Sequence, residues 1–128
     1  MKILLDTHLL LWAAADELPP QAERFIEDCA NTLIFSTASI WEVVIKHGLG
    51  RQDFIVDPAS LYGGLLGAGY QELPVLGRHT LLVSTLPPLH KDPFDRILLA
   101  QAASEGIPLL TADEFLLRYP CSVIYAGN

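Results

Sequence analysis

Carboxylates are the side chains of this sequence whose spacing best supports chemistry. Asp92 precedes Pro93, which suits the first turn of a helix, and Asp95 follows three residues later, so both acids crowd one helix N-terminus. With three further acids they form the candidate set: Asp6, Glu42, Asp92, Asp95 and Asp113. Mg²⁺ and Mn²⁺ prefer such oxygen ligands, and a bound cation activates water against a phosphodiester. Metal-assisted phosphodiester hydrolysis is therefore the chemistry to expect.

The elements that must position these acids alternate between strands and helices. Short apolar runs predict strands over residues 2–5, 32–35, 71–74, 107–110 and 122–125. Capped or amphipathic stretches predict helices over residues 8–15, 19–30, 40–47, 57–66, 77–86, 92–105 and 114–119. Strands separated in this way by helices predict an α/β fold, in which helices cover both faces of a mostly parallel sheet.

This topology predicts where the acids meet. Asp6 ends the first expected strand and Asp113 lies just past the fourth, while Glu42 and Asp95 lie in the first turns of helices that begin on the same side. Ligands of open parallel sheets collect outside the carboxyl ends of the strands. We therefore expect the carboxylates to converge at that edge.

Helix capping is the alternative explanation for each acid. The stretches Ser39-Ile40-Trp41-Glu42 and Thr111-Ala112-Asp113-Glu114 match a capping box, and Asp92-Pro93-Phe94-Asp95 is a close variant. Asp6 could cap the helix that follows it. Capping alone does not require the acids to share one edge, however, and like charges held together there would repel. A bound cation resolves that repulsion.

Composition limits the class of protein. The chain has 128 residues, 51% of them hydrophobic, which suits a single domain over residues 1–128. Its apolar runs are shorter than a membrane span and it opens on no signal-peptide pattern, so we expect a cytoplasmic protein without a membrane partner. The net charge of −7 disfavours a simple DNA-binding module. Cys29 and Cys121 show no metal-binding spacing and are expected to be reduced packing residues.

Four blocks of the chain carry a family resemblance. They are Leu4-Leu5-Asp6-Thr7-His8 with Leu11-Trp12; residues 36–50 around Ser39-Ile40-Trp41-Glu42 and Ile45-Lys46; residues 90–102 with Asp92-Pro93-Phe94-Asp95-Arg96; and Leu110-Thr111-Ala112-Asp113. In this order and spacing they resemble PIN-domain proteins, and more narrowly the VapC ribonuclease toxins of type II toxin–antitoxin pairs. The resemblance spans nearly the whole chain.

The resemblance implies a PIN-like three-layer α/β/α sandwich with a central, mostly parallel sheet of about five strands. It also implies an endoribonuclease that depends on Mg²⁺ or Mn²⁺, a homodimer, and a cognate antitoxin protein that inhibits the enzyme. The family's catalytic and metal-binding acids correspond to Asp6, Glu42, Asp95 and Asp113. Auxiliary or carboxylate-orienting roles are expected for Thr7, Ser39, Asp92 and Thr111.

Basic and aromatic residues near these blocks carry weaker expectations. Lys46, Arg51 and Arg96 could contact phosphates of the RNA or acidic groups of the antitoxin, with ordinary solvated surface as the alternative. The four histidines, His8, His47, His79 and His90, show no metal-ligand spacing and receive no role. Trp12 and Trp41 are expected in the core or at a dimer interface. The apolar run of residues 9–12 also indicates an interface.

Three alternatives remain. An Mg²⁺-binding, phosphate-receiving signalling domain would need a lysine after a late strand and an aspartate closing the middle strand, and neither is present. A haloacid-dehalogenase-like phosphatase would show D-x-D after the first strand, where this chain has Asp6-Thr7-His8. A non-catalytic PIN-like binding module would be expected to lack one of the four acids, and none is lost.

Overall fold

The computed structural model describes residues 1–50 and 56–127. Its strands are β1 (Lys2–Leu5), β2 (Thr32–Ser36), β3 (Gln71–Leu73), β4 (Leu109–Thr111) and β5 (Val123–Tyr125). Its helices are α1 (Thr7–Ala14), α2 (Pro20–Glu27), α3 (Thr37–Gly48), α4 (Pro58–Gly67), α5 (Gly77–Val83), α6 (Pro93–Glu105) and the 3₁₀ helix η1 (Glu114–Arg118). Within the described residues, no helix combines the length and the apolar character that a membrane crossing requires.

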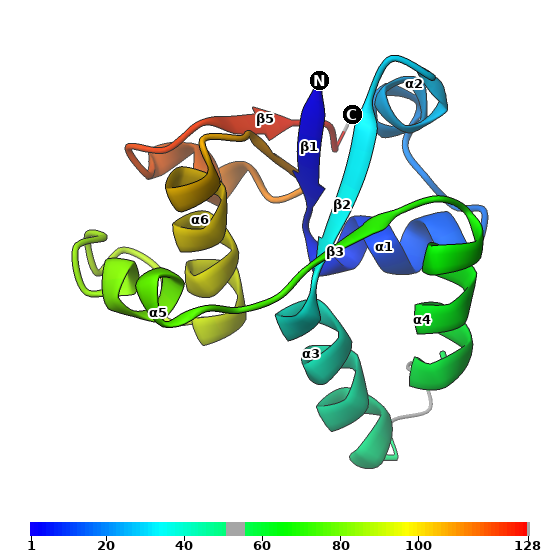
Figure 1. Cartoon of the computed structure of the whole chain (residues 1–128), viewed down its shortest axis with the longest axis horizontal. Coiled ribbons are helices and arrows are strands. Elements are labelled where there is room, and N and C mark those ends of the chain that lie inside the picture. Colours follow the sequence, from blue (N-terminus) through cyan, green and yellow to red (C-terminus); the bar gives the residue numbers. More distant parts are fainter. Residues whose placement is uncertain (51–55, 128) are drawn as a thin grey trace.

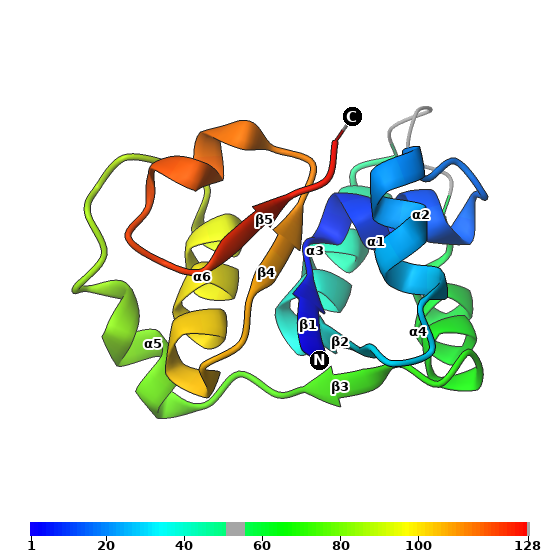
Figure 2. The same cartoon turned by 90° about the horizontal axis from the view of Figure 1, so that it is seen from above.

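The strands form one parallel sheet in the order β3-β2-β1-β4-β5. The central strand β1 pairs with β2, where Ile3 lies opposite Leu33, and with β4, where Leu5 lies opposite Leu110. Strand order reverses at β1, so the loops after β1 and β4 leave the sheet side by side. Helices α5 and α6 cover one face and α1, α2 and α4 lie on the other (Figures 1 and 2). The predicted three-layer α/β/α fold is confirmed.

Side chains alternate between two buried clusters because successive strand residues point to opposite faces of a sheet. Ile3 and Leu5 of β1 join Phe35 in the cluster beneath α1, α2 and α4. Leu4, between them, joins Leu98 and Leu109 in the cluster beneath α6. Burial of both faces explains why Ile3-Leu4-Leu5 of β1 is an unbroken apolar run.

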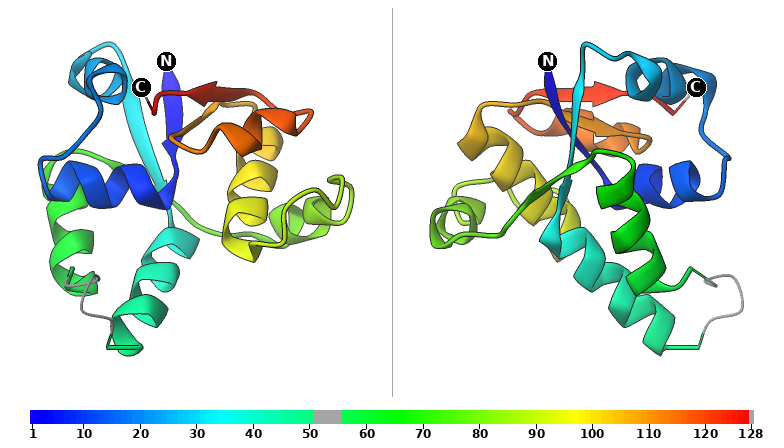
Figure 3. Two further views of the ribbon diagram at one scale, coloured as in Figure 1. Left: turned by 180° about the vertical axis from the view of Figure 1, so that it is seen from behind. Right: turned by 45° about the vertical axis from the view of Figure 1, so that its right-hand side comes forward.

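Helix α3 differs in position from the covering helices. It continues from the end of β2 and projects past the edge of the sheet (Figures 1 and 3). There it contacts α1, α4 and α6, which belong to both helical layers. Residues of α3 can therefore face the carboxyl ends of the strands.

Most helix ends agree with the sequence. Asp57 caps α4, its carboxylate accepting from the Ser60 N–H at 2.9 Å, and α6 ends at Gly106, whose φ of 67° is the left-handed conformation that glycine favours. Three boundaries were wrong by three residues: α2 ends at Glu27 rather than 30, α3 begins at Thr37 rather than 40, and α5 ends at Val83 rather than 86. The last helix is a short 3₁₀ helix, and β4 begins at Leu109, past Pro108.

The cysteines are unpaired in the described part of the chain. Cys121 is part-buried and packs against the cluster beneath α6, as expected. Cys29 is exposed, so the prediction that it packs in the core was wrong. It lies in the turn between α2 and β2.

Candidate active site

One cavity of about 280 Å³ opens at the carboxyl ends of β1 and β4. Its lining residues come from four separate segments of the chain. They are Asp6, Thr7, His8, Glu42, Lys46, His90, Asp92, Asp95 and Asp113. The expected convergence of the acids is therefore observed, and it brings two histidines and one lysine with it.

Asp6 is held in place from two directions. It ends β1 and caps α1, its Oδ1 accepting from the Leu9 N–H at 2.9 Å, as the capping alternative predicted. Its Oδ2 accepts a hydrogen bond from the Thr111 hydroxyl, which lies at the end of β4. The side chain is only 4% exposed, and this burial raises the pKa of Asp6, although the bonds from Thr111 and Leu9 oppose the shift. Capping thus fixes this carboxylate at the cavity.

Glu42 does not have the capping role that the sequence offered. The N-cap of α3 is Ser36, whose hydroxyl accepts from the Ala38 N–H at 3.0 Å, so Ser39 lies inside the first turn. Glu42 is consequently in the second turn, 6% exposed and facing the cavity. The capping-box interpretation of Ser39 and Glu42 was wrong. Lys46, one turn further on, forms an ion pair with Glu42 at 2.8 Å.

Thr7 and Ser39 link the two helices that carry Asp6 and Glu42. The Thr7 hydroxyl donates to Ser39 Oγ at 2.8 Å, and both residues are buried. This bond joins the first turn of α1 to the first turn of α3. It holds the two acids in a fixed relation.

Asp92 and Asp95 have separate functions at the start of α6. Asp92 is the N-cap, accepting from the N–H groups of Phe94 at 2.9 Å and Asp95 at 3.4 Å. The Asp95 carboxylate instead faces His90, with 2.9 Å between Nε2 and Oδ2. Burial first, and the charges of Asp92 and Asp6, raise the pKa of Asp95 to about 6, against the lowering effect of His90. Such repulsion is what a bound cation would relieve.

Asp113 and Thr111 also depart from a capping box. Asp113 is itself the N-cap of η1, accepting from the Phe115 N–H at 3.0 Å. Thr111 Oγ1 accepts from the Asp113 N–H at 3.0 Å while its hydrogen goes to Asp6. Thr111 therefore ties together two of the candidate acids, a contact that supports the orienting role predicted for it.

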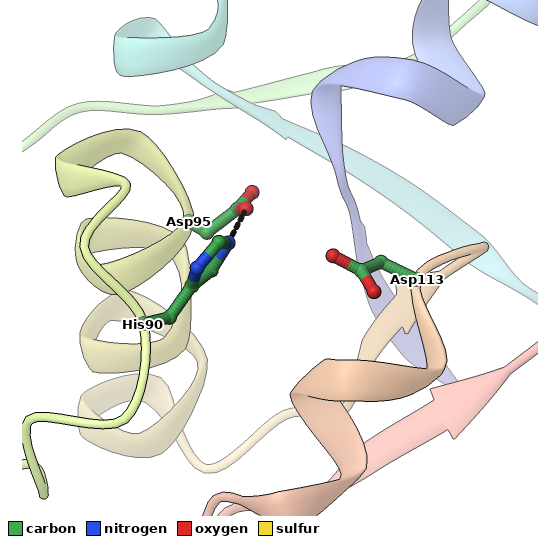
Figure 4. A group of neighbouring side chains, drawn as sticks. All are labelled: His90, Asp95 and Asp113. Atoms are coloured by element: carbon green, nitrogen blue, oxygen red, sulfur yellow. Dashed lines mark hydrogen bonds and ion pairs between the residues drawn. The ribbon is translucent and has the colours of Figure 1, made fainter.

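His90 was missed by the sequence analysis. His90, Asp95 and Asp113 each present a ligand atom within 4.8 Å of the others, and Figure 4 shows the Asp113 carboxylate facing the His90–Asp95 pair across a gap. The centroid of the His90 ring lies 5.2 Å from that of the Phe115 ring. The backbone N–H of His90 donates to the Tyr119 hydroxyl at 2.8 Å. The only local signal is its position two residues before the cap of α6.

Arg96 and Arg51 were expected to contact RNA or the antitoxin. The Arg96 guanidinium donates to the carbonyls of Pro87 at 2.9 Å and Val83 at 3.1 Å, and to the Tyr119 hydroxyl at 3.3 Å. The proposed contact with phosphate or antitoxin was therefore wrong for Arg96, whose donors brace the segment before α6. Arg51 lies outside the described residues.

We expect Arg96→Met to destabilise the fold while leaving the cavity residues in place. Two part-buried carbonyls lose their donor, which costs on the order of 2 kcal/mol of unfolding free energy. Urea denaturation measures this loss, and Arg24→Met on the exposed face of α2 is the control, expected to change stability by less than about 0.5 kcal/mol. If Arg96→Met has the unfolding free energy of the wild-type protein but binds RNA weakly, Arg96 contacts phosphate after all.

The remaining aromatic and histidine residues separate into core and surface. Trp12 is part-buried against the cluster beneath α1, and Leu9 and Leu10 are fully buried there, so these leucines are core rather than interface. Trp41 is 62% exposed, so it does not lie in the core, and its expected place at a dimer interface stays a prediction. His79 is buried, with Nδ1 accepting from the Leu76 N–H at 2.9 Å, and His47 is exposed.

Fold and site together define an α/β protein that gathers acidic side chains at the carboxyl edge of a parallel sheet. The family model of the PIN domain matches residues 3–120. The chain belongs to the PIN domain family, as the resemblance indicated. A search of curated proteins finds no match.

Several solved structures share this fold at low sequence identity. A chain of VapBC2 from Rickettsia felis, bound to a promoter DNA fragment, is similar with a TM-score of 0.73 and 17% identity over 98% of both chains. VapBC-1 from nontypeable Haemophilus influenzae gives 0.68 and 17% over 100% of both chains. A toxin–antitoxin complex from Klebsiella pneumoniae gives 0.68 and 17% over 97% of both.

Proposed function

We propose that this chain is a divalent-metal-dependent endoribonuclease and the toxin of a VapC-type toxin–antitoxin pair. The observation that carries the proposal is the cavity into which Asp6, Glu42, Asp95 and Asp113 converge from four different segments. Membership of the PIN domain family and the similarity to structures named VapBC support it. Cytoplasmic action on RNA is the corresponding expectation.

The residues of the cavity fit a hard divalent cation. Burial raises the pKa of both Asp6 and Asp95, and the charges of Asp92 and Asp6 add to the rise for Asp95. A cation removes that cost, because it favours the ionised form of every acid around it. Asp6, Glu42, Asp95 and Asp113 would hold Mg²⁺ or Mn²⁺ through carboxylate oxygens. When bound, such an ion polarises the phosphodiester, lowers the pKa of the attacking water and stabilises the leaving oxygen.

The chain's own groups would orient the reaction. Thr111 and the Leu9 N–H fix both oxygens of Asp6, so this carboxylate cannot rotate away from the cavity. The Thr7–Ser39 bond sets the spacing between α1 and α3. Lys46 supplies a positive charge beside Glu42 in the cavity, and its ammonium group would donate to a phosphate oxygen of the RNA. Asp92 acts mainly by starting α6, with an auxiliary electrostatic effect on Asp95.

Cleavage of structured RNA by the purified protein tests the function. We expect cleavage with Mg²⁺ or Mn²⁺ and none after EDTA, with activity restored by adding the metal back. Cleavage that persists in EDTA would exclude the metal mechanism. Full metal binding without cleavage of any RNA would instead favour the non-catalytic PIN-like module.

An apolar groove beside the cavity offers a place for the antitoxin. The groove has a volume of about 510 Å³ and lies between α3, α5 and the start of α6. Neighbouring residues line the two hollows. On α3, Trp41 lines the groove while Glu42 lines the cavity, and on α6, Phe94 lines the groove while Asp95 lines the cavity. The Trp41 and Phe94 rings meet edge to face at 5.6 Å. Because groove and cavity share helices, an antitoxin segment with apolar and basic side chains could fill the first and neutralise the second.

Trp41→Glu is expected to weaken binding of the antitoxin while the free enzyme still cleaves RNA. A buried tryptophan anchor contributes about 2 kcal/mol or more, so the dissociation constant should rise by roughly 30-fold. Calorimetry with the cognate antitoxin measures it. Leu117→Glu, an exposed apolar residue of η1 outside the groove, is the matched control. Equal affinity of both variants would remove the groove from the antitoxin interface.

The homodimer implied by the resemblance stays a proposal. Val44 and Ile45 of α3 and Leu49, which caps its C-terminus, are exposed apolar side chains outside the groove lining. Light scattering of the isolated protein decides between monomer and dimer.

A further inference from the structure

A nitrogen ligand stands among the oxygen ligands of the cavity. His90 Nε2 lies 2.9 Å from Asp95 Oδ2, and both lie within 4.8 Å of a carboxylate oxygen of Asp113. Two neighbouring ligands of one octahedral ion with bonds of about 2.1 Å lie about 3.0 Å apart. The spacing of Nε2 and Oδ2 is therefore that of two atoms ready to share a cation (Figure 4).

The position of the His90 ring is set by contacts outside the cavity. The backbone N–H of His90 donates to the Tyr119 hydroxyl, which also accepts from Arg96. The ring packs against Phe115, with 5.2 Å between ring centroids. Phe115 belongs to η1, the element that Asp113 caps, so one short segment positions both the histidine and the facing carboxylate. A ring fixed in this way loses little freedom when it binds an ion.

We propose that His90 is a direct ligand of the divalent ion, through Nε2, and that it makes this site prefer Mn²⁺ over Mg²⁺. This inference rests on the proposed metal-dependent function. Imidazole nitrogen binds first-row transition ions well, whereas Mg²⁺ takes oxygen ligands almost exclusively. Four carboxylates alone would serve either ion, so His90 is the group that discriminates between them. The rival arrangement is an Nε2–H that only donates to Asp95 and never touches the ion.

His8 is the other histidine of the cavity, and it provides the comparison. It is exposed, and its ring stacks obliquely on Trp12 with 5.1 Å between centroids. It lines the cavity beside Asp6 but does not belong to the group of ligand atoms formed by His90, Asp95 and Asp113 in the described residues. His47 is exposed at the end of α3 and lies outside the cavity lining. The chain thus offers one proposed ligand and two matched controls.

Pulsed EPR of the Mn²⁺-loaded protein tests the ligand directly, because nitrogen bound to Mn²⁺ produces a ¹⁴N hyperfine coupling. We expect the coupling in the wild-type protein, in His8→Gln and in His47→Gln, and its loss in His90→Gln. Labelling the wild-type protein with ¹⁵N-histidine should change the coupling pattern, a readout that needs no variant to fold. In titrations, His90→Gln should bind Mn²⁺ roughly tenfold or more weakly, with a smaller loss for Mg²⁺.

The opposite outcomes are equally clear. Bound Mn²⁺ without ¹⁴N coupling in the wild-type protein, or coupling that survives in His90→Gln and disappears in His8→Gln, overturns the assignment. So does an equal loss of Mg²⁺ and Mn²⁺ affinity in His90→Gln. RNA cleavage by the wild-type protein is recorded separately: if it occurs with Mg²⁺ while ¹⁴N coupling is absent, the inference fails and the ribonuclease stands. A protein that binds neither ion overturns both.

Discussion

Replacing Asp95 by asparagine is expected to lower the rate of RNA cleavage by about three orders of magnitude at saturating Mg²⁺. Asparagine keeps the shape of the side chain but removes the carboxylate that we propose binds the ion beside His90 and Asp113. Charge stabilisation by a correctly held ion contributes several kcal/mol to such a reaction. Single-turnover cleavage of a labelled RNA measures the chemical step. The loss should appear in the rate constant rather than in RNA affinity.

Asp92→Asn is the informative control for that change. Asparagine caps a helix as well as aspartate does, so α6 should keep its start, and the cleavage rate should fall by no more than about tenfold. Asp16→Asn, at an exposed position with a φ of 57° that asparagine tolerates, should leave the rate unchanged. Equal losses in Asp92→Asn and Asp95→Asn would mean that the two acids act as one unit, against the separation of capping and ligand roles.

The sheet and its order of elements were accessible from the sequence because burial on both faces leaves an unmistakable pattern. A parallel strand that is covered on both faces has a continuous apolar stretch, such as Ile3-Leu4-Leu5 of β1 and Leu109-Leu110 of β4. Helix N-caps were also predictable where only one capping residue was available. Asp57 and Asp92 each precede a proline at the first helical position. Convergence of the acids then followed from topology alone.

The start of α3 was misread because two serines compete for it. Ser36 and Ser39 are both good caps, and the sequence offers no local reason to choose. The decision is tertiary: β2 extends to Ser36, which lies opposite Leu73 of β3, and the helix begins directly after that pair. Moving the cap by three residues turns Glu42 from a capping residue into one that faces the cavity.

Arg96 and His90 were misjudged for a related reason. The partners of Arg96 lie at Val83, Pro87 and Tyr119, and the ring of His90 rests on Phe115. The sequence separations of these contacts match neither a helical nor a strand period, so the contacts could not be predicted from a pattern in the sequence. Trp41 illustrates the same limit, since α3 carries apolar residues on more than one side.

The metal-free protein is expected to lose stability as pH rises from about 4 to about 6, and Asp95→Asn should remove much of that loss. Asp95 has a pKa of about 6 in the folded protein and an ordinary value of 3.8 when unfolded. Between these values the folded state binds more protons than the unfolded state, so the unfolding free energy falls with rising pH. One pKa unit corresponds to about 1.4 kcal/mol, so the shift contributes on the order of 2–3 kcal/mol.

Urea denaturation in EDTA at pH 4 and at pH 8 separates the electrostatic role of Asp95 from a structural one. The two proteins should be nearly equally stable at pH 4, where Asp95 is protonated, and Asp95→Asn should be the more stable at pH 8. Added Mg²⁺ should cancel most of that difference, because it stabilises the wild-type protein by about 2.7 kcal/mol at one hundred times its dissociation constant and the variant by less. If Asp95→Asn is the less stable protein at pH 8 without metal, the Asp95 carboxylate stabilises the fold. That result would contradict the proposal that its charge is unfavourable until a cation binds.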